Sequence, residues 1–181
     1  MLALVVGDDG VQLEERPPPT LADGQVRVRM LRAGVCNTDL EIARGYMGFQ
    51  GIVGHELLGE VIDGPRAGER VVCEINFACG HCGDCARGLG KHCAARTVMG
   101  ILNQDGAFAE EVAVPLANLH RVPDDVPDDA AVFVEPLAAA FEILEQLGDV
   151  TDHSAWVLGD GKLGLLIAQV LQGAGADITL V

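Results

Sequence analysis

Residues 79–93 read CGHCGDCARGLGKHC, and the four cysteines in this stretch have the spacing C-x2-C-x2-C-x7-C. Short loops of this kind let neighbouring thiolates converge on one tetrahedral Zn²⁺. Four cysteine ligands leave no open position for water, so such a site is structural rather than catalytic. The interspersed glycines allow the sharp turns that the loops need. The stretch therefore predicts a structural zinc site with the ligands Cys79, Cys82, Cys85 and Cys93.

Other interpretations of the cysteine run are less favoured. A bacterial ferredoxin run ends in C-x3-C-P, whereas here the last gap is longer and Ala94 follows Cys93. A redox CxxC pair would use only two of the four cysteines. A disulfide framework is typical of secreted proteins, but the start MLALVVGDDG lacks the basic region and the long apolar run of a signal peptide. Metal ligation is therefore the favoured use of these cysteines.

The composition is that of a globular protein and excludes some partners. The chain has 181 residues, of which 49% are hydrophobic and 22% are charged. Its net charge of −15 repels phosphate backbones, so we expect no nucleic-acid binding. No apolar stretch approaches the roughly 20 residues of a membrane span. We expect a cytoplasmic protein that has no membrane partner.

The first part of the chain predicts a barrel-like β domain over residues 1–127. Short runs that alternate apolar and polar residues are separated by turns rich in Gly and Pro, which is typical of such domains. A short helix or turn is expected over residues 36–44, and the cysteine-rich lobe covers residues 76–100. The expected strands are residues 1–6, 11–15, 25–32, 53–62, 70–75 and 108–114.

The pattern changes after about residue 128, and residues 128–181 predict helices followed by a strand–helix–strand unit. Helical periodicity runs through Asp128–Leu147, where Pro136 marks a break or a helix start. A strand over 155–158, a helix over 162–172 and a strand over 177–181 follow. The sequence GDGKLG begins at Gly159, between the first strand and the helix. This is the context in which G-x-G-x-x-G binds a dinucleotide.

Five short motifs follow one another along the chain. They are Cys36-Asn37-Thr38-Asp39, Gly54-His55-Glu56, the four-cysteine run, Glu135-Pro136 and Gly159-Asp160-Gly161-Lys162-Leu163-Gly164. In this order they closely resemble the zinc-containing medium-chain dehydrogenase/reductase family, which includes alcohol and polyol dehydrogenases. The resemblance implies a mainly β, GroES-like catalytic domain with a zinc lobe, followed by helices and the first β-α-β unit of a Rossmann fold.

The resemblance also implies a second, catalytic zinc. Cys36 and His55 correspond to its ligands, and a carboxylate from Glu56 or Glu135 completes the set. The residues themselves leave open which glutamate binds directly. Thr38 matches the hydroxyl that relays the substrate proton, and Asp39 matches a carboxylate that orients the ligand histidine.

The dinucleotide motif implies a nicotinamide cofactor. Gly159 and Gly161 would permit a tight turn and close approach to the pyrophosphate, and Gly164 would let the helix pack on the strand. The acidic residue that selects NAD is expected about 20 residues further on, beyond Val181. The sequence therefore does not choose between NAD and NADP, and we expect the chain to be a fragment that stops within the Rossmann domain.

These features imply a zinc-dependent oxidoreductase that transfers hydride from a zinc-bound alcohol to NAD(P)⁺. Its expected substrate is a small alcohol, polyol or sugar. Two zinc ions per chain, one catalytic and one structural, are expected, and the intact protein is expected to be a homo-oligomer. The alternative is a non-catalytic, zinc-stabilised β-barrel module that serves structure or interaction.

Overall fold

The computed structural model describes residues 1–181, which form two compact units, Met1–Val132 and Phe133–Val181. The periodicity predicts a boundary between residues 127 and 128, whereas the two units meet after Val132. The difference arises because the short helix α3 (Asp128–Ala131) stays with the first unit. Its first residue, Asp128, is ion-paired to Arg70 of that unit at 2.9 Å.

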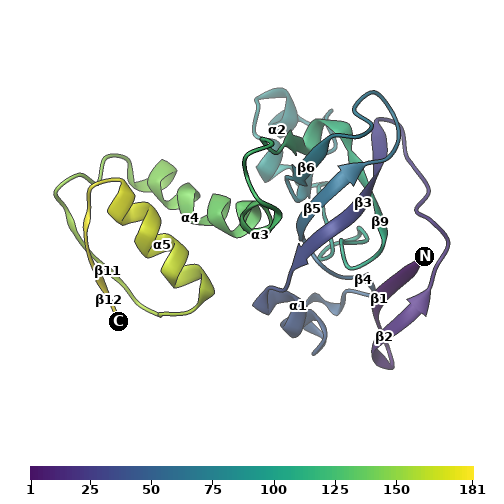
Figure 1. Ribbon diagram of the computed structural model, residues 1–181, viewed down its shortest axis with the longest axis horizontal. Helices are drawn as coiled ribbons and strands as arrows, with labels where there is room; N and C mark the ends of the chain where they lie inside the picture. The colour runs from purple at the N-terminus through teal and green to yellow at the C-terminus, as the bar shows by residue number, and fades with distance from the viewer. The chain divides into compact units, whose positions relative to one another are not determined.

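The first unit is built from short antiparallel strands (Figure 1). One sheet has the order β10-β6-β5-β3-β9, a second has the order β2-β1-β4, and β7 pairs with β8. A bridge between Ala3 and Ala109 links β1 to the segment before β9. The strands are β1 (Leu2–Gly7), β2 (Gly10–Glu15), β3 (Gln25–Gly34), β4 (Gly51–Ile52), β5 (Glu56–Val61), β6 (Arg70–Cys73), β7 (Asn76–Phe77), β8 (Thr97–Val98), β9 (Glu111–Pro115) and β10 (Leu119–Arg121).

Short helices connect these strands. The helix α1 (Asn37–Ile42) follows β3, and α2 (Gly83–Ala86) lies within the cysteine-rich lobe. Three 3-10 turns complete the unit, namely η1 (Tyr46–Gly48), η2 (Gly90–His92) and η3 (Leu116–Asn118).

The apolar run 53–62 predicts a single strand, but within it the structure has only β5, which begins at Glu56; residues 53–55 form a turn that follows the short strand β4. Gly54 has a φ of +97°, a left-handed conformation that few side chains tolerate. A Cβ at this position would also lie 2.5 Å from the ring of Phe108. The chain therefore turns at Gly54, and His55 lies outside the strand ladder.

The main core lies against the five-stranded sheet. The alternation predicted for residues 25–32 is confirmed at Val26 and Val28, which are 4% and 0% exposed. Phe77 and Met99, at the two ends of the lobe, also belong to this core. The ends of the lobe, where the chain returns to the barrel, therefore contribute to the main core.

The second unit contains α4 (Val134–Leu147), β11 (Ser154–Val157), α5 (Lys162–Gly173) and β12 (Asp177–Leu180). The strands β11 and β12 pair in parallel, so the predicted strand–helix–strand unit is confirmed. Its core joins residues of α4, such as Ile143 and Leu144, to Ile167 of α5. Pro136 is the third residue of α4 and so marks a helix start, where its missing N–H is not needed.

None of the helices combines the length and the apolar character that a bilayer crossing requires.

Candidate functional site

The sulfur atoms of the cysteine run lie together in the lobe. Sγ of Cys82 lies 3.5 Å from Sγ of Cys85 and 3.7 Å from Sγ of Cys93, and the Cys79 and Cys85 sulfurs are 3.9 Å apart. These distances exclude disulfides, which need about 2.05 Å. A tetrahedral zinc with bonds of about 2.3 Å separates its sulfurs by about 3.8 Å. The geometry therefore fits a four-cysteine zinc site.

The pKa values of Cys79 and Cys85 are shifted in opposite directions. A hydrogen bond from the backbone of His81 lowers the pKa of Cys79 to about 6. A side-chain hydrogen bond with Cys82 raises the pKa of Cys85 to about 11. A bound divalent cation would favour the thiolate form of these sulfurs, since metal ligation requires deprotonated cysteine.

The remaining cysteine of the barrel sheet, Cys73, is 6% exposed and packs in the main core. Burial raises the pKa of its thiol. It is a packing residue, in agreement with the strand pattern around it.

A second group of donor atoms comes from three separate elements. One ligand atom each of Cys36, His55 and Glu56 lies within 4.8 Å of the others. Cys36 is the N-cap of α1, His55 lies in the turn between β4 and β5, and Glu56 begins β5. The structure thus gathers a thiol, an imidazole and a carboxylate, which are the donor types that zinc takes in catalytic sites.

Asp39 connects two members of this group. Its Oδ2 accepts a hydrogen bond of 2.8 Å from the backbone N–H of Cys36, which caps α1. Its Oδ1 lies 3.2 Å from Nδ1 of His55, and both side chains are buried. One carboxylate therefore fixes the backbone of Cys36 and faces the ring of His55.

Thr38 lies beside the same group. Its Oγ1 is 3.6 Å from Sγ of Cys36, and its side chain is half-buried. A hydroxyl at this position is near enough to exchange a proton with a molecule bound next to the sulfur.

The backbone behind His55 is held by close glycine packing. The N–H of Ala107 donates to the carbonyl of Gly54 at 2.9 Å. A Cβ at Gly100 or Gly106 would lie 2.3 or 2.2 Å from that carbonyl oxygen. Neither glycine was predicted to support the site. Both lie outside the expected strands, so no local pattern marks their close packing.

Glu135, the other candidate ligand in the sequence, belongs to the second unit and lies in the first turn of α4.

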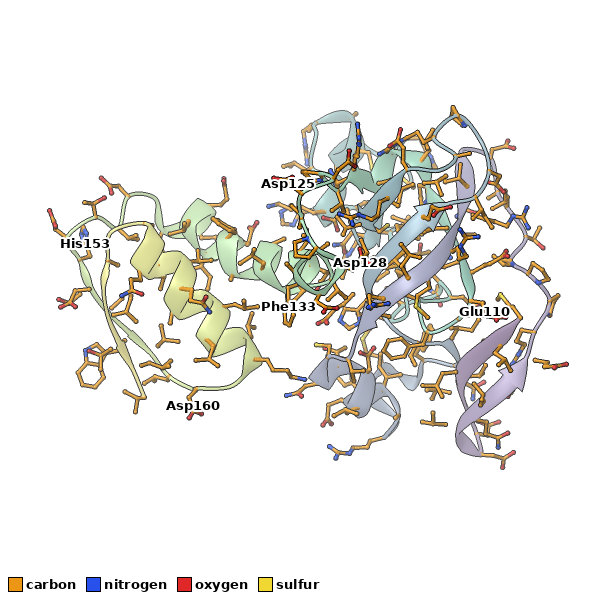
Figure 2. The ribbon with its side chains drawn as sticks, in the orientation of Figure 1. Glu110, Asp125, Asp128, Phe133, His153 and Asp160 are labelled. Atoms are coloured by element: carbon orange, nitrogen blue, oxygen red, sulfur yellow. The ribbon has the colours of Figure 1, made fainter.

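The glycine motif forms the turn between β11 and α5, where Asp160 also lies (Figure 2). Gly159 has a φ of +111°, and a Cβ on Gly164 would lie 1.9 Å from the carbonyl oxygen of Gly159. Gly161 caps α5, and a Cβ there would meet nothing within 4 Å. The turn therefore leaves open space at a helix N-terminus, the arrangement that accepts a phosphate group.

Comparison with known proteins agrees with this architecture. Residues 22–124 match the family model of the alcohol dehydrogenase GroES-like domain. The starvation-sensing protein RspB of Escherichia coli is 34% identical over 94% of this chain, and L-threonine 3-dehydrogenase of Streptomyces coelicolor is 38% identical over 93% of it.

A solved structure also covers nearly the whole chain. The crystal structure of a short chain alcohol dehydrogenase (rspB) from Escherichia coli, in complex with NADH, superposes on 99% of this chain with a TM-score of 0.90 and 32% identity. That superposition covers 56% of the solved chain. This chain spans about half the length of the curated relatives it matches, 52% for both named here.

These matches confirm the expected fold, a GroES-like β domain with a lobe followed by helices and one β-α-β unit. Since the family model covers more than half of its residues, this chain belongs to the family of alcohol dehydrogenase GroES-like domains.

Proposed function

We propose that this chain is the zinc-holding part of an oxidoreductase that moves hydride between a small alcohol and NAD(P). The observation that carries the proposal is the convergence of Cys36, His55 and Glu56 within 4.8 Å. A structural module would need only the cysteine lobe. A second donor set with three ligand types is typical of a catalytic zinc, which keeps one position open.

The catalytic zinc would be held by the thiolate of Cys36, the imidazole of His55 and a carboxylate. Glu56 lies within 4.8 Å of the other two ligand atoms and is the carboxylate that we propose, with Glu135 as the alternative. Because Nδ1 of His55 faces Asp39, Nε2 is the nitrogen left for the metal. A bound zinc ion supplies Lewis-acid polarisation of the alcohol oxygen.

The chain's own residues would then orient the reactants and move the proton. Asp39 would keep the proton on Nδ1 of His55, so that the other nitrogen presents its lone pair. Thr38 would accept the proton of the substrate hydroxyl and pass it outward. The turn formed by Gly159, Gly161 and Gly164 would hold the cofactor pyrophosphate against the N-terminus of α5.

A second zinc, held by the four lobe cysteines, would be structural. Its role would be to hold residues 76–100 together, since only short elements lie between β7 and β8. We therefore propose two zinc ions per chain.

The proposed substrate is a small alcohol, polyol or sugar. One curated relative is an L-threonine 3-dehydrogenase, so L-threonine, which carries a secondary hydroxyl, belongs in the first panel. We further propose a cytoplasmic location and homo-oligomeric assembly for the whole protein.

Zinc analysis of the purified chain tests the proposal. We expect two zinc ions per chain in the parent and one in each of the variants Cys36→Ser and Cys82→Ser. Cys73→Ala is the matched control, because this buried cysteine lies outside both groups and its loss should leave both ions. A single zinc in the parent would instead favour the non-catalytic module.

Reduction of NAD⁺ or NADP⁺ by the whole protein with a panel of alcohols, polyols, sugars and L-threonine tests the reaction. Cys36→Ser should abolish it. Full activity of that variant would remove Cys36 from the catalytic zinc.

A further inference from the structure

Gly34 lies directly opposite Glu56 in the ladder between β3 and β5. A β-bulge between Met30 and Arg32 creates this pairing, because it shifts the register of β3 by one residue. In the register that precedes the bulge, Gly34 would have faced His55 instead. Bulges commonly re-aim side chains beside functional sites.

The absent side chain of Gly34 leaves the space that the Glu56 carboxylate occupies. A Cβ at Gly34 would lie 1.9 Å from Oε2 of Glu56, 3.0 Å from its Cδ and 3.1 Å from its Cβ. A distance of 1.9 Å is far below van der Waals contact between carbon and oxygen, so the carboxylate would have to move. Backbone strain plays no part here, because Gly34 is not among the glycines with positive φ.

The same strand end leads directly to another member of the donor group. Two residues after Gly34 the chain reaches Cys36, the N-cap of α1. The Gly34–Glu56 pair thus connects the end of β3, which leads to the thiol of Cys36, to the start of β5, which carries the carboxylate of Glu56.

We propose that Gly34 is a positioning residue for the catalytic metal: it lets the Glu56 carboxylate fold inward over the strand pair, beside Cys36 and His55. This inference rests on the proposed function, in which Glu56 is the favoured third ligand. It assigns a role to a residue that contacts neither substrate nor cofactor and acts only through Glu56.

The test is the zinc affinity of the second site, measured by competition with a chelating indicator on the full chain. We expect Gly34→Ala to weaken that site about 10–100-fold, the usual cost of disturbing a group that supports a ligand, and to leave the lobe zinc in place. Gly7→Ala is the matched control. Gly7 ends β1 without a positive φ, and a Cβ there meets nothing within 4 Å, so affinity should not change.

The variant Glu56→Ala separates this role from general damage to the strand. If Gly34 acts through the carboxylate, Gly34→Ala should cause no further loss of affinity in the Glu56→Ala background. An equal loss in both backgrounds, or parent affinity in Gly34→Ala alone, would overturn the inference while the zinc site stands. A parent chain with one zinc would overturn both the inference and the proposed function.

Folding provides a second measurement. Should Gly34→Ala unfold the chain, the double variant Gly34→Ala/Glu56→Ala should recover most of the parent melting temperature, because the carboxylate is gone and only the Cβ of residue 56, at 3.1 Å, remains close. A double variant as unstable as the single one would count against the role of Glu56.

Discussion

Oδ1 of Asp39 lies 3.2 Å from Nδ1 of His55, and the two side chains are 4% and 5% exposed. The other oxygen of Asp39 accepts the backbone N–H of Cys36. A short helix cap and the orientation of a candidate ligand therefore depend on one buried carboxylate. Because the two oxygens of Asp39 have different partners, substitutions at this position can distinguish the effect of its charge on His55 from its role as a helix cap.

Asp39→Asn keeps an oxygen for the N–H of Cys36 but removes the negative charge beside His55. We expect zinc affinity at the second site to fall about 10–100-fold, with little change in unfolding free energy. Asp39→Ala should show the same loss of affinity and, in addition, lose about 1 kcal/mol from the missing cap. Asp23→Asn, at an exposed position, is the control. Unchanged zinc affinity in Asp39→Asn would contradict the orienting role.

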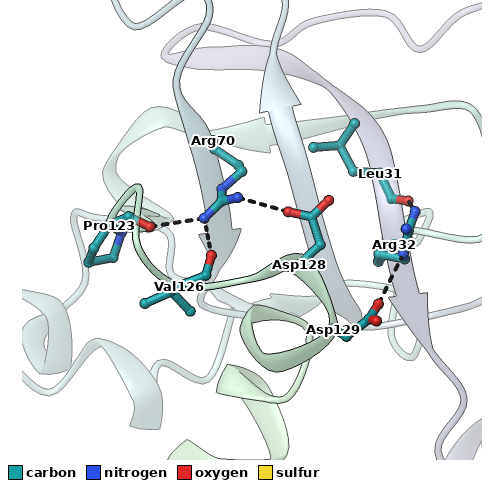
Figure 3. A network of polar contacts seen from close by, with 7 residues as sticks. All are labelled: Leu31, Arg32, Arg70, Pro123, Val126, Asp128 and Asp129. Carbon is teal, nitrogen blue, oxygen red and sulfur yellow. Dashed lines mark hydrogen bonds and ion pairs between the residues drawn. The ribbon is translucent and has the colours of Figure 1, made fainter.

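Arg70 anchors the end of the first unit (Figure 3). Its guanidinium pairs with Asp128 at 2.9 Å and donates to the carbonyls of Pro123 and Val126. Arg70→Leu would leave these acceptors without their donor, so we expect a loss of about 1–3 kcal/mol in urea unfolding. Arg32→Leu is the control. Arg32 meets Asp129 at 3.5 Å and that carboxylate is 91% exposed, so its loss should cost under about 1 kcal/mol. An equal loss of unfolding free energy in the two variants would contradict the stabilising role of Arg70.

Asp63 gives a pH-dependent contribution to stability. Arg27 donates to it through Nε at 2.8 Å and through its backbone N–H at 2.9 Å, which holds the pKa of Asp63 below its ordinary value of 3.8. A carboxyl with a lowered folded pKa stabilises the fold above its unfolded pKa, and this contribution disappears as the pH falls through the folded pKa.

We therefore expect parent and Asp63→Asn to differ in unfolding free energy at pH 7 and to converge as the pH falls below 3.8 and through the lowered folded pKa of Asp63. Asp125→Asn, at an exposed position, is the control. The comparison uses urea unfolding at a series of pH values. A constant difference down to the lowest pH would show that Asp63 does not stabilise through its charge.

Replacement by alanine should have different effects on thermal stability at two glycines of the second unit, Gly164 and Gly161. In Gly164→Ala the new Cβ would meet the carbonyl of Gly159 at 1.9 Å, so thermal unfolding of this unit should begin at a lower temperature. Gly161→Ala finds open space and a φ of −76°, so it should unfold like the parent. The two melting curves, followed by fluorescence of the single Trp156 in this unit, check the prediction. Similar curves for both variants would contradict the close packing of Gly164.

Elements that depend on neighbouring residues could be predicted from the sequence. The first hairpin, the strand Gln25–Gly34 and the parallel unit that contains α5 agree with their periodicity. The break at Gly54 could not be predicted, because the ring that leaves no room for a side chain there belongs to Phe108, which is distant in the sequence. The attachment of α3 to the first unit could not be predicted from the sequence either, since it depends on the ion pair between Arg70 and Asp128.

The sequence by itself determined the four-cysteine lobe and the glycine turn, because ligands with only two to seven residues between them converge through local loops. Only the tertiary structure brings the carboxylate of Glu56 beside Cys36 and His55. These residues come from different elements, and their meeting depends on the register of β3 against β5. A bulge of one residue sets that register and places Gly34 opposite Glu56. No local pattern encodes it, because register is fixed by packing across the whole sheet.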